Sequence, residues 1–178
     1  MNEYSRIRCA FEVNTIYDIE FRKNGLEGIF LNELKPENPY VKNYDLYENP
    51  EDWIKKFEMS RWGIFISKFE NVKDAGGVIV ACKTKDIILP ENRDDAAVIW
   101  DIRINPEFRR KGVGKMLFNK AVEFAKEMNC SLIKIETQNT NVPACKFYAE
   151  MGCYLGGIRK NMYNEFPEEY QLLWYYDL

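Results

Sequence analysis

The sequence predicts an α+β domain with a mixed, mostly antiparallel central sheet and helices on both faces. The run Ala96–Ile104 is rich in β-branched and aromatic residues and is ended by Pro106, which is typical of a strand. Directly afterwards, apolar residues recur at helical spacing over 113–125. Strand and helix patterns then alternate to the end of the chain. Together these patterns favour a sheet covered by helices.

The remaining elements follow from the same patterns. In the first half we expect a strand over 6–13, a helix over 20–34, a proline-rich loop over 35–50, a short helix over 51–60, and strands over 62–69 and 77–85 joined by a turn over 71–76. A polar loop over 86–95 follows. In the second half we expect a helix over 112–128, a strand over 132–137, a helix over 143–151 closed by Gly152, and strands over 153–158 and 170–176.

Composition limits the classes of function. The 178 residues suffice for one domain with a substantial core, and we expect 1–178 to form it. Aromatic residues make up 15% of the chain, which favours folding. The net charge of −3 and the pI of about 5.3 argue against a nucleic-acid partner and favour a cationic small molecule. Without a membrane-spanning run or a signal peptide, we expect a cytoplasmic protein with no membrane partner. A homodimer is left open.

Cysteine and histidine usage narrows the chemistry further. The five cysteines form no Cys-x-x-Cys pair, so we expect reduced, mostly buried thiols. The chain has no histidine, which excludes Ser-His and Cys-His catalysis. A zinc site would need cysteines and carboxylates at unsuitable spacings, so no metal is expected.

A basic, glycine-containing turn lies between the strand at 96–104 and the following helix. Its sequence, 109–114, is Arg-Arg-Lys-Gly-Val-Gly. The first amides of a helix have no intrahelical acceptor and the helix dipole adds positive charge, so this turn suits an anion. Glycines let a phosphate approach, and Arg109, Lys111 and Lys115 add full charges. The alternative is a surface turn with a basic helix start.

The turn matches neither common nucleotide motif. No third glycine follows at the spacing of the dinucleotide fingerprint. A P-loop would need an earlier glycine, and Met116 stands where that motif has a Mg²⁺-binding Ser or Thr. The turn fits instead the pattern Arg/Gln-x-x-Gly-x-Gly/Ala.

A second motif follows the predicted strand at 132–137. It is Asn141-Val142-Pro143-Ala144-Cys145-Lys146-Phe147-Tyr148, which fits Asn-x-x-Ala-x-x-x-Tyr. With these two motifs in this order, the chain from Ala96 onward resembles the GNAT superfamily of N-acetyltransferases. Residues 136–148 and 172–176 are similar to its streptothricin acetyltransferase branch. The resemblance implies the GNAT fold, acetyl-CoA as co-substrate, and a pantetheine arm in the gap between two splayed strands.

The resemblance also implies which residues contact acetyl-CoA. Main-chain groups of the first strand would pair with the pantetheine and polarise the thioester carbonyl, and the basic turn would hold the pyrophosphate. The implied contacts are Ile102, Arg103, Ile104, Arg109, Arg110, Lys111, Gly112, Val113, Gly114, Lys115, Asn141 and Ala144. Asn141 also suits a helix N-cap, and both roles are compatible.

Three residues are candidates for catalysis. Tyr148 matches the motif tyrosine that protonates the leaving thiolate; alternatively it is a core tyrosine on an amphipathic helix. Asp101 and Glu136 are candidates for deprotonating the amine, and the alternative for each is a solvated or salt-bridged charge at a strand end. The streptothricin branch often carries a glutamate just before Asp101, where this chain has Trp100, so a base at that position is in doubt.

Two further features have competing interpretations. Cys145 would be an acyl carrier only if a base activated it, so a buried thiol is favoured. Trp174, Tyr175 and Tyr176, with Glu168 and Glu169 nearby, would suit a cation pocket. An ordinary final strand is favoured for at least two of the three rings, since alternate residues face opposite sides.

The sequence therefore predicts an acetyl-CoA-dependent N-acetyltransferase that acts by direct transfer on a primary amine of a small molecule. A streptothricin-like antibiotic is the acceptor that the resemblance implies. The alternatives are acetylation of a protein N-terminus or lysine, and a CoA-binding regulatory module without turnover.

Overall fold

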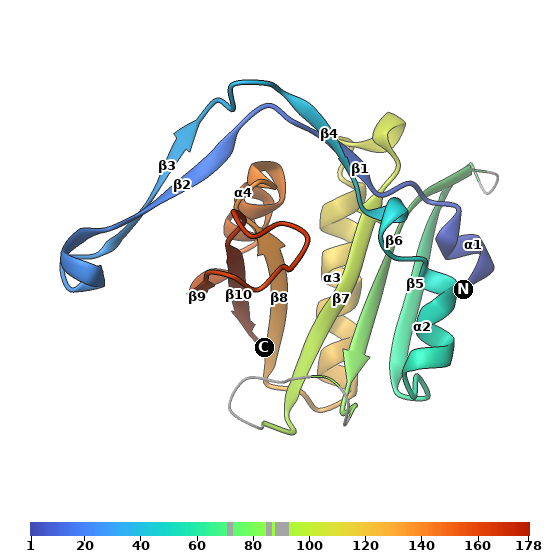
Figure 1. Ribbon diagram of the computed structural model, residues 1–178. Coiled ribbons are helices and arrows are strands. Elements are labelled where there is room, and N and C mark those ends of the chain that lie inside the picture. The colour runs from blue at the N-terminus through green and yellow to red at the C-terminus, as the bar shows by residue number, and fades with distance from the viewer. Residues whose placement is uncertain (71–72, 85–86, 88–92) are drawn as a thin grey trace. The chain divides into compact units, whose positions relative to one another are not determined.

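The computed structural model describes residues 1–70, 73–84, 87 and 93–178. Figure 1 shows its helices and strands. In chain order these are α1 (Asn2–Ser5), β1 (Ala10–Val13), β2 (Ile16–Phe21), η1 (Arg22–Gly25), β3 (Ile29–Leu34), β4 (Tyr40–Asn43), η2 (Tyr44–Leu46), α2 (Pro50–Lys56), β5 (Trp62–Phe69), β6 (Lys73–Cys82), β7 (Ala96–Ile104), η4 (Pro106–Phe108), α3 (Val113–Glu127), β8 (Leu132–Gln138), α4 (Val142–Glu150), β9 (Tyr154–Arg159) and β10 (Gln171–Asp177).

A six-stranded sheet with the order β5-β6-β7-β8-β10-β9 organises the chain. β5 and β6 are antiparallel, as are β6 and β7, whereas β7 and β8 are parallel. Parallel neighbours need a crossover, and α3 supplies it between β7 and β8. Two smaller sheets pair β1 with β4 and β2 with β3. The predicted α+β class with a mixed, mostly antiparallel sheet is confirmed.

Backbone contacts divide the chain into two compact units. The first comprises Met1–Ala10, Asn43–Ile135 and Tyr175–Leu178, and the second comprises Phe11–Lys42 and Glu136–Trp174. The first unit therefore holds α1, α2, β5–β7 and α3, and the second holds the β2–β3 hairpin, α4 and β9. The expectation of a single domain over 1–178 stays a prediction.

Helices cover both faces of the sheet in the first unit. A Cβ atom at Gly76 of β6 would meet Leu117 of α3, whereas a Cβ at Gly77 would meet Tyr4 of α1. Consecutive residues of a strand point to opposite faces, so α3 and α1 lie on opposite sides of β6. On the α1 side, buried Tyr4, Trp53, Trp62, Ile79, Ala81 and Val98 form one apolar cluster. The predicted helices on both faces are confirmed.

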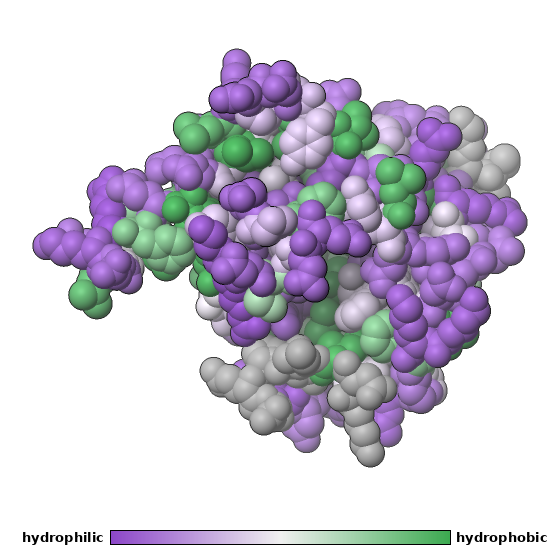
Figure 2. Space-filling model, viewed as in Figure 1, coloured by the Kyte–Doolittle hydropathy of each residue, from purple (hydrophilic) through white to green (hydrophobic). Residues whose placement is uncertain are grey.

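The first half of the chain departs from its predicted elements. The helix predicted over 20–34 is wrong, because that stretch contains part of β2, the turn η1 and β3, paired from Ile16↔Leu34 to Phe21↔Ile29. Lys23, Asn24 and Gly25 all have positive φ, which a hairpin turn needs and a helix does not allow. Hydrophobic and hydrophilic side chains are interspersed on this hairpin (Figure 2). Its mixed periodicity reflects strands with little of their surface buried.

Smaller differences concern the bounds of elements. The strand predicted over 6–13 is shortened to β1 because α1 precedes it, and the helix predicted over 51–60 ends with α2 at Lys56. The loop predicted over 35–50 contains β4 and η2. Of the turn predicted over 71–76, residues 73–76 belong to β6, and 71–72 lie outside the described residues. Most of the loop predicted over 86–95 also lies outside the described residues.

The second half follows the predictions closely. β7 has the predicted bounds, as does β5 in the first half. At each end, α3, β8, α4, β9 and β10 differ from their predicted bounds by at most one residue. Gly152 closes α4 with φ +89°, and the amide of Cys153 donates to the carbonyl oxygen of Tyr148, as in a helix-ending glycine motif. No helix among the described residues is long and apolar enough to cross a membrane.

Candidate active site

The turn between β7 and α3 has the backbone of an anion cradle. Arg110 and Gly112 both adopt left-handed conformations, with φ of +61° and +83°. Gly112 is the N-cap of α3, and in the described chain no side chain caps that helix start. A Cβ atom at Gly112 would meet no described atom within 4 Å, so open space lies on that side of the turn. The first amides of α3 are therefore available to an anion such as a diphosphate.

The basic side chains of this turn differ in their surroundings. Arg109 donates from Nε to the carbonyl oxygen of Ile104 at 3.2 Å, and its terminal nitrogen donates to the carbonyl oxygen of Ala10. Its guanidinium thus ties the turn to the main chain of β7 and β1. Arg110 and Lys115 are exposed, and the Lys111 ammonium lies 5.3 Å from the Phe108 ring centroid. These three exposed side chains supply positive charge to the turn and the start of α3.

Among the described residues, β7 pairs with β8 only over the N-terminal part of β7. Its register with β8 extends only from Ala96↔Leu132 to Ile99↔Ile135, whereas its register with β6 continues to Ile104. A register shift against Ile79 and Val80 makes Trp100 the extra residue of a β-bulge. The predicted contacts Ile102, Arg103 and Ile104 lie beyond this bulge. Their main chain is suited to pairing with an extended ligand as an added strand.

The Trp100 side chain belongs to the core rather than to the catalytic chemistry. Its ring centroid lies 4.9 Å from that of Phe57, 5.5 Å from Trp62 and 6.1 Å from Trp53. Where the related branch often has an acid, this chain therefore has an aromatic packing residue.

Asp101 lies in a buried polar network. The Tyr4 hydroxyl donates to Oδ2 of Asp101 at 2.8 Å, and Nε of Arg103 donates to the same oxygen at 2.6 Å. Arg103 also donates to Oδ1 of Asp45 and to the carbonyl oxygen of Ile7, both at 3.0 Å. Only 3% of the Arg103 side chain and 16% of that of Asp101 are exposed. The Asp101 carboxylate is thus a counter-ion of a buried guanidinium, and its removal would be costly.

The Tyr4 phenol is fixed as a hydrogen-bond donor in this network. Burial first, and the Asp101 carboxylate second, raise the pKa of Tyr4 well above its ordinary value. No sequence motif indicates this role of Tyr4, which lies in a helix of four residues.

Glu136 has the opposite environment. It is an exposed residue of β8, and the Tyr163 hydroxyl donates to its Oε1 at 2.8 Å. Nε2 of Gln138, two residues further along β8, donates to the same hydroxyl at 3.2 Å. In the described part of the chain no basic side chain pairs with Glu136. The carboxylate of this exposed residue is thus held at one oxygen by a phenol.

The second motif forms α4 as predicted. Asn141 is its N-cap, and the Asn141 side chain accepts a hydrogen bond from the amide of Ala144 at 3.3 Å. The N-cap role of Asn141 is thereby confirmed, while its contact with acetyl-CoA stays a prediction. Tyr148 is 4% exposed and packs on Phe147 with ring centroids 5.3 Å apart. This surrounding suits a core residue and also a proton donor shielded from bulk water.

Cys145 is a buried thiol rather than an activated nucleophile. It lies 3.4 Å from the Thr137 hydroxyl, and burial raises the pKa of the thiol to about 11. Cys82, Cys130 and Cys153 are buried too, and Cys9 is partly buried. The expectation of reduced, mostly buried thiols is confirmed for the five cysteines.

The C-terminal aromatic residues serve mainly as core. Trp174 is buried, and its Nε1 donates to the Thr137 hydroxyl at 3.1 Å. The Tyr176 ring packs edge-on against Phe118, with centroids 5.4 Å apart. Glu169 is buried and forms an ion pair with Lys42, so its charge is already matched within the chain. The core interpretation is confirmed for these two rings.

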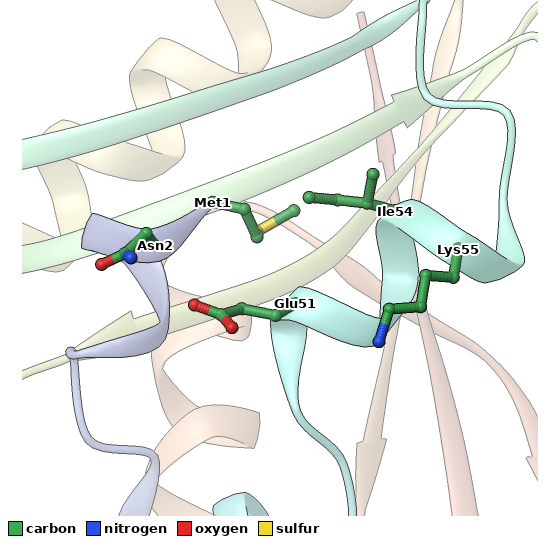
Figure 3. A pocket seen from close by; sticks show the side chains of 5 residues that line it. All are labelled: Met1, Asn2, Glu51, Ile54 and Lys55. Carbon is green, nitrogen blue, oxygen red and sulfur yellow. The ribbon is translucent and has the colours of Figure 1, made fainter.

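A shallow hollow of about 320 Å³ lies elsewhere, between α1 and α2. Met1, Asn2, Glu51, Ile54 and Lys55 line it (Figure 3). None of these residues belongs to the two motifs. We therefore assign no part of the chemistry to this hollow.

Comparison with known proteins identifies the class that these features define. Residues 28–153, which are most of the chain, match the acetyltransferase (GNAT) family. The chain therefore belongs to the GNAT family of acetyltransferase enzymes, as the two motifs predicted. The α+β fold with its six-stranded mixed sheet is the fold of this family.

Individual relatives give a finer picture. The chain is 38% identical to streptothricin acetyltransferase A of Bacillus subtilis over 51% of its length and 53% of that protein, so this match spans only about half of that relative. It is 28% identical to a streptothricin acetyltransferase of Escherichia coli over 93% of this chain and 84% of that one. The ribosomal protein bS18-alanine N-acetyltransferase of Escherichia coli is 25% identical over 62% of this chain and 70% of its own.

A solved structure extends the likeness to the whole chain. A provisionally assigned streptothricin acetyltransferase of Bacillus anthracis, crystallised with acetyl coenzyme A, superposes with a TM-score of 0.77. It is 28% identical, and the match covers 99% of this chain and 93% of that one. This relative thus binds acetyl-CoA on the same fold.

Proposed function

We propose that this protein transfers the acetyl group of acetyl-CoA to a primary amine of a cationic small molecule of the streptothricin type. One observation carries the choice of acceptor. The likeness to streptothricin acetyltransferases extends over 93% of the chain in sequence and 99% in structure, and so includes the first half. That half is the variable part of a GNAT enzyme, in which the family builds its acceptor site. The likeness to the bS18-alanine enzyme of Escherichia coli covers 62% of the chain in sequence and 74% in structure.

The turn before α3 is suited to holding the co-substrate. Its left-handed Gly112, its open side and the exposed Arg110 and Lys115 fit a diphosphate. The main chain of β7 beyond Trp100 would hold the pantetheine as an added strand. An amide there would polarise the thioester carbonyl.

Transfer then needs one bond made and one broken. The neutral amine attacks the thioester carbonyl carbon, the C–N bond forms, and the C–S bond breaks. Glu136, directly or through a water molecule, takes the proton that the amine loses. Tyr148 gives its proton to the departing thiolate. The ordinary pKa of a phenol, ~10, is above that of a thiol, ~8.5, so this proton transfer is modestly uphill. Direct transfer needs no acyl-enzyme, which agrees with the inert environment of Cys145.

A panel of acceptors tests the proposal. Protein and acetyl-CoA are mixed with a streptothricin mixture, a polyamine, a peptide with N-terminal alanine and a lysine peptide, and the free thiol of CoA is followed with a thiol-reactive dye. We expect the largest kcat/KM with the streptothricin mixture, and mass spectrometry should find one added acetyl group on it. A larger kcat/KM with the alanine peptide would favour the protein-acetylating alternative. Binding of acetyl-CoA without turnover on any amine would favour a regulatory module.

A further inference from the structure

Tyr163 lies in a segment that neither motif includes. It follows β9 and precedes β10, and its side chain is half-buried. Glu136 and Gln138 are two residues apart on β8, so their side chains leave the strand on the same face. The Tyr163 hydroxyl accepts from Nε2 of Gln138 and donates to Oε1 of Glu136. The three side chains thus form a directed chain of hydrogen bonds that ends on the carboxylate.

The phenol keeps its proton in this position. Burial first, and the Glu136 charge second, raise the pKa of Tyr163 well above its ordinary value, while Gln138 opposes the rise. The other carboxylate that acts on it is Glu169, which the Lys42 ammonium neutralises in a buried ion pair. The hydroxyl is therefore a donor to Glu136 over the working pH range.

We propose that Tyr163 is a positioning residue for Glu136: its hydroxyl fixes Oε1 of the carboxylate and leaves Oε2 to receive the proton of the acceptor amine. This inference rests on the proposed function, because it assigns Glu136 as the base. In the described residues Oε1 has one donor, Tyr163, and Oε2 has none, so one oxygen is held and one is available. A flexible glutamate on an exposed strand face otherwise samples several rotamers. One hydrogen bond to its charged form restricts it without neutralising it.

Kinetics on four variants test this role: Tyr163→Phe, Glu136→Gln, the double variant and, as a matched control, Tyr154→Phe at an exposed tyrosine of β9. The best amine of the acceptor panel is the substrate. We expect Tyr163→Phe to lower kcat about tenfold, with acetyl-CoA affinity and melting temperature close to those of the parent. In the Glu136→Gln background the same change should cost less than about twofold, since its target is gone. Tyr154→Phe should leave kcat, acetyl-CoA affinity and melting temperature unchanged.

Two kinetic results would overturn the proposal. One is a kcat of Tyr163→Phe within about twofold of the parent. The other is an equal loss in both backgrounds, which would mean that Tyr163 acts independently of Glu136.

A readout without turnover separates this inference from the proposed function. The carboxyl ¹³C chemical shift of Glu136, with the resonance assigned by its loss in Glu136→Gln, is compared between the parent and Tyr163→Phe at one neutral pH. We expect it to differ in the variant, because the carboxylate loses the hydrogen bond from the Tyr163 hydroxyl. If no amine is acetylated but this difference is present, the proposed function fails while the contact stands. An identical chemical shift in both proteins would contradict the contact itself.

Discussion

The two candidate carboxylates, Asp101 of β7 and Glu136 of β8, show how differently the same kind of side chain can be used. Asp101 receives the Tyr4 hydroxyl and the Arg103 guanidinium inside a buried network. Glu136 is exposed and receives the Tyr163 hydroxyl. The first carboxylate neutralises a buried cation, and the second has a solvent-facing oxygen. On this ground we propose Glu136, rather than Asp101, as the base.

The same contrast applies to the regions around them. The β7–α3 region offers amides, glycine and positive charge, which suit binding. The β8–α4 region offers a carboxylate, a phenol and a capped helix start, which suit proton transfer. Changes in the first region should thus alter affinity or stability, and changes in the second should alter turnover.

The largest expected effect is that of Tyr148→Phe. The substitution keeps the ring and its contact with Phe147 but removes the proton donor. General acids contribute about 10²–10⁴-fold, so kcat should fall by that factor while acetyl-CoA affinity changes little. Steady-state kinetics and calorimetry measure both. If kcat stays within about threefold of the parent while chemistry is rate-limiting, Tyr148 is only a core residue. In that case the substitution should only lower the melting temperature modestly.

Asp101→Asn should act on stability. The substitution removes one of the two carboxylates that pair with the buried Arg103 guanidinium and leaves only Asp45. This loss should lower the free energy of unfolding by about 3 kcal/mol. Urea unfolding measures this loss. The control Asp18→Asn on exposed β2 should change stability by less than about 0.5 kcal/mol. If Asp101→Asn and Asp18→Asn were equally stable, the stabilising role of the Asp101 carboxylate in the buried network would be wrong.

Gly112→Asp should weaken acetyl-CoA binding by more than about tenfold, because it places a negative charge against the diphosphate. Gly112 has φ +83°, so backbone strain alone must be separated from the effect on binding. Gly25→Asp in the β2–β3 turn is a matched control, since Gly25 has φ +94°. Calorimetry should detect weakened binding only in the first variant. Unchanged affinity in folded Gly112→Asp would reject the assignment of the turn.

The smallest expected effect is that of Cys145→Ala, which should retain kcat within about threefold. Burial raises the pKa of this thiol to about 11, which makes it a poor nucleophile near neutral pH. Mass spectrometry of a quenched reaction should find no acetyl group on Cys145. A stable acetyl-cysteine there, together with abolished activity in the variant, would instead indicate a two-step route.

The sequence was most informative where packing and motif agree. β7, α3, β8 and α4 carry dense apolar periodicity, so their bounds could be predicted nearly to the residue. The β2–β3 hairpin has little buried surface, so its residues show no clean alternation and were misread as a helix. The Asn24-Gly25 pair was a usable turn signal there.

For the candidate site, the two motifs suffice to locate the turn, the helix cap and Tyr148. They do not reveal partners that folding brings from distant positions. Tyr4 reaches Asp101 across 97 residues, and Tyr163 reaches Glu136 across 27. The choice between the two carboxylates depends on these contacts, and neither tyrosine lies in a recognisable pattern.

The most direct test of the division between the two regions compares Glu136→Gln with the parent in one assay of kcat/KM and melting temperature, using the best amine of the acceptor panel. We predict that Glu136→Gln lowers kcat/KM by about 10²-fold or more, because the base is lost, while an exposed substitution leaves the melting temperature nearly unchanged. If Glu136→Gln instead retains kcat/KM within about threefold while folded Asp101→Asn loses 10²-fold or more, Asp101 is the base and the proposed division between the two carboxylates is wrong.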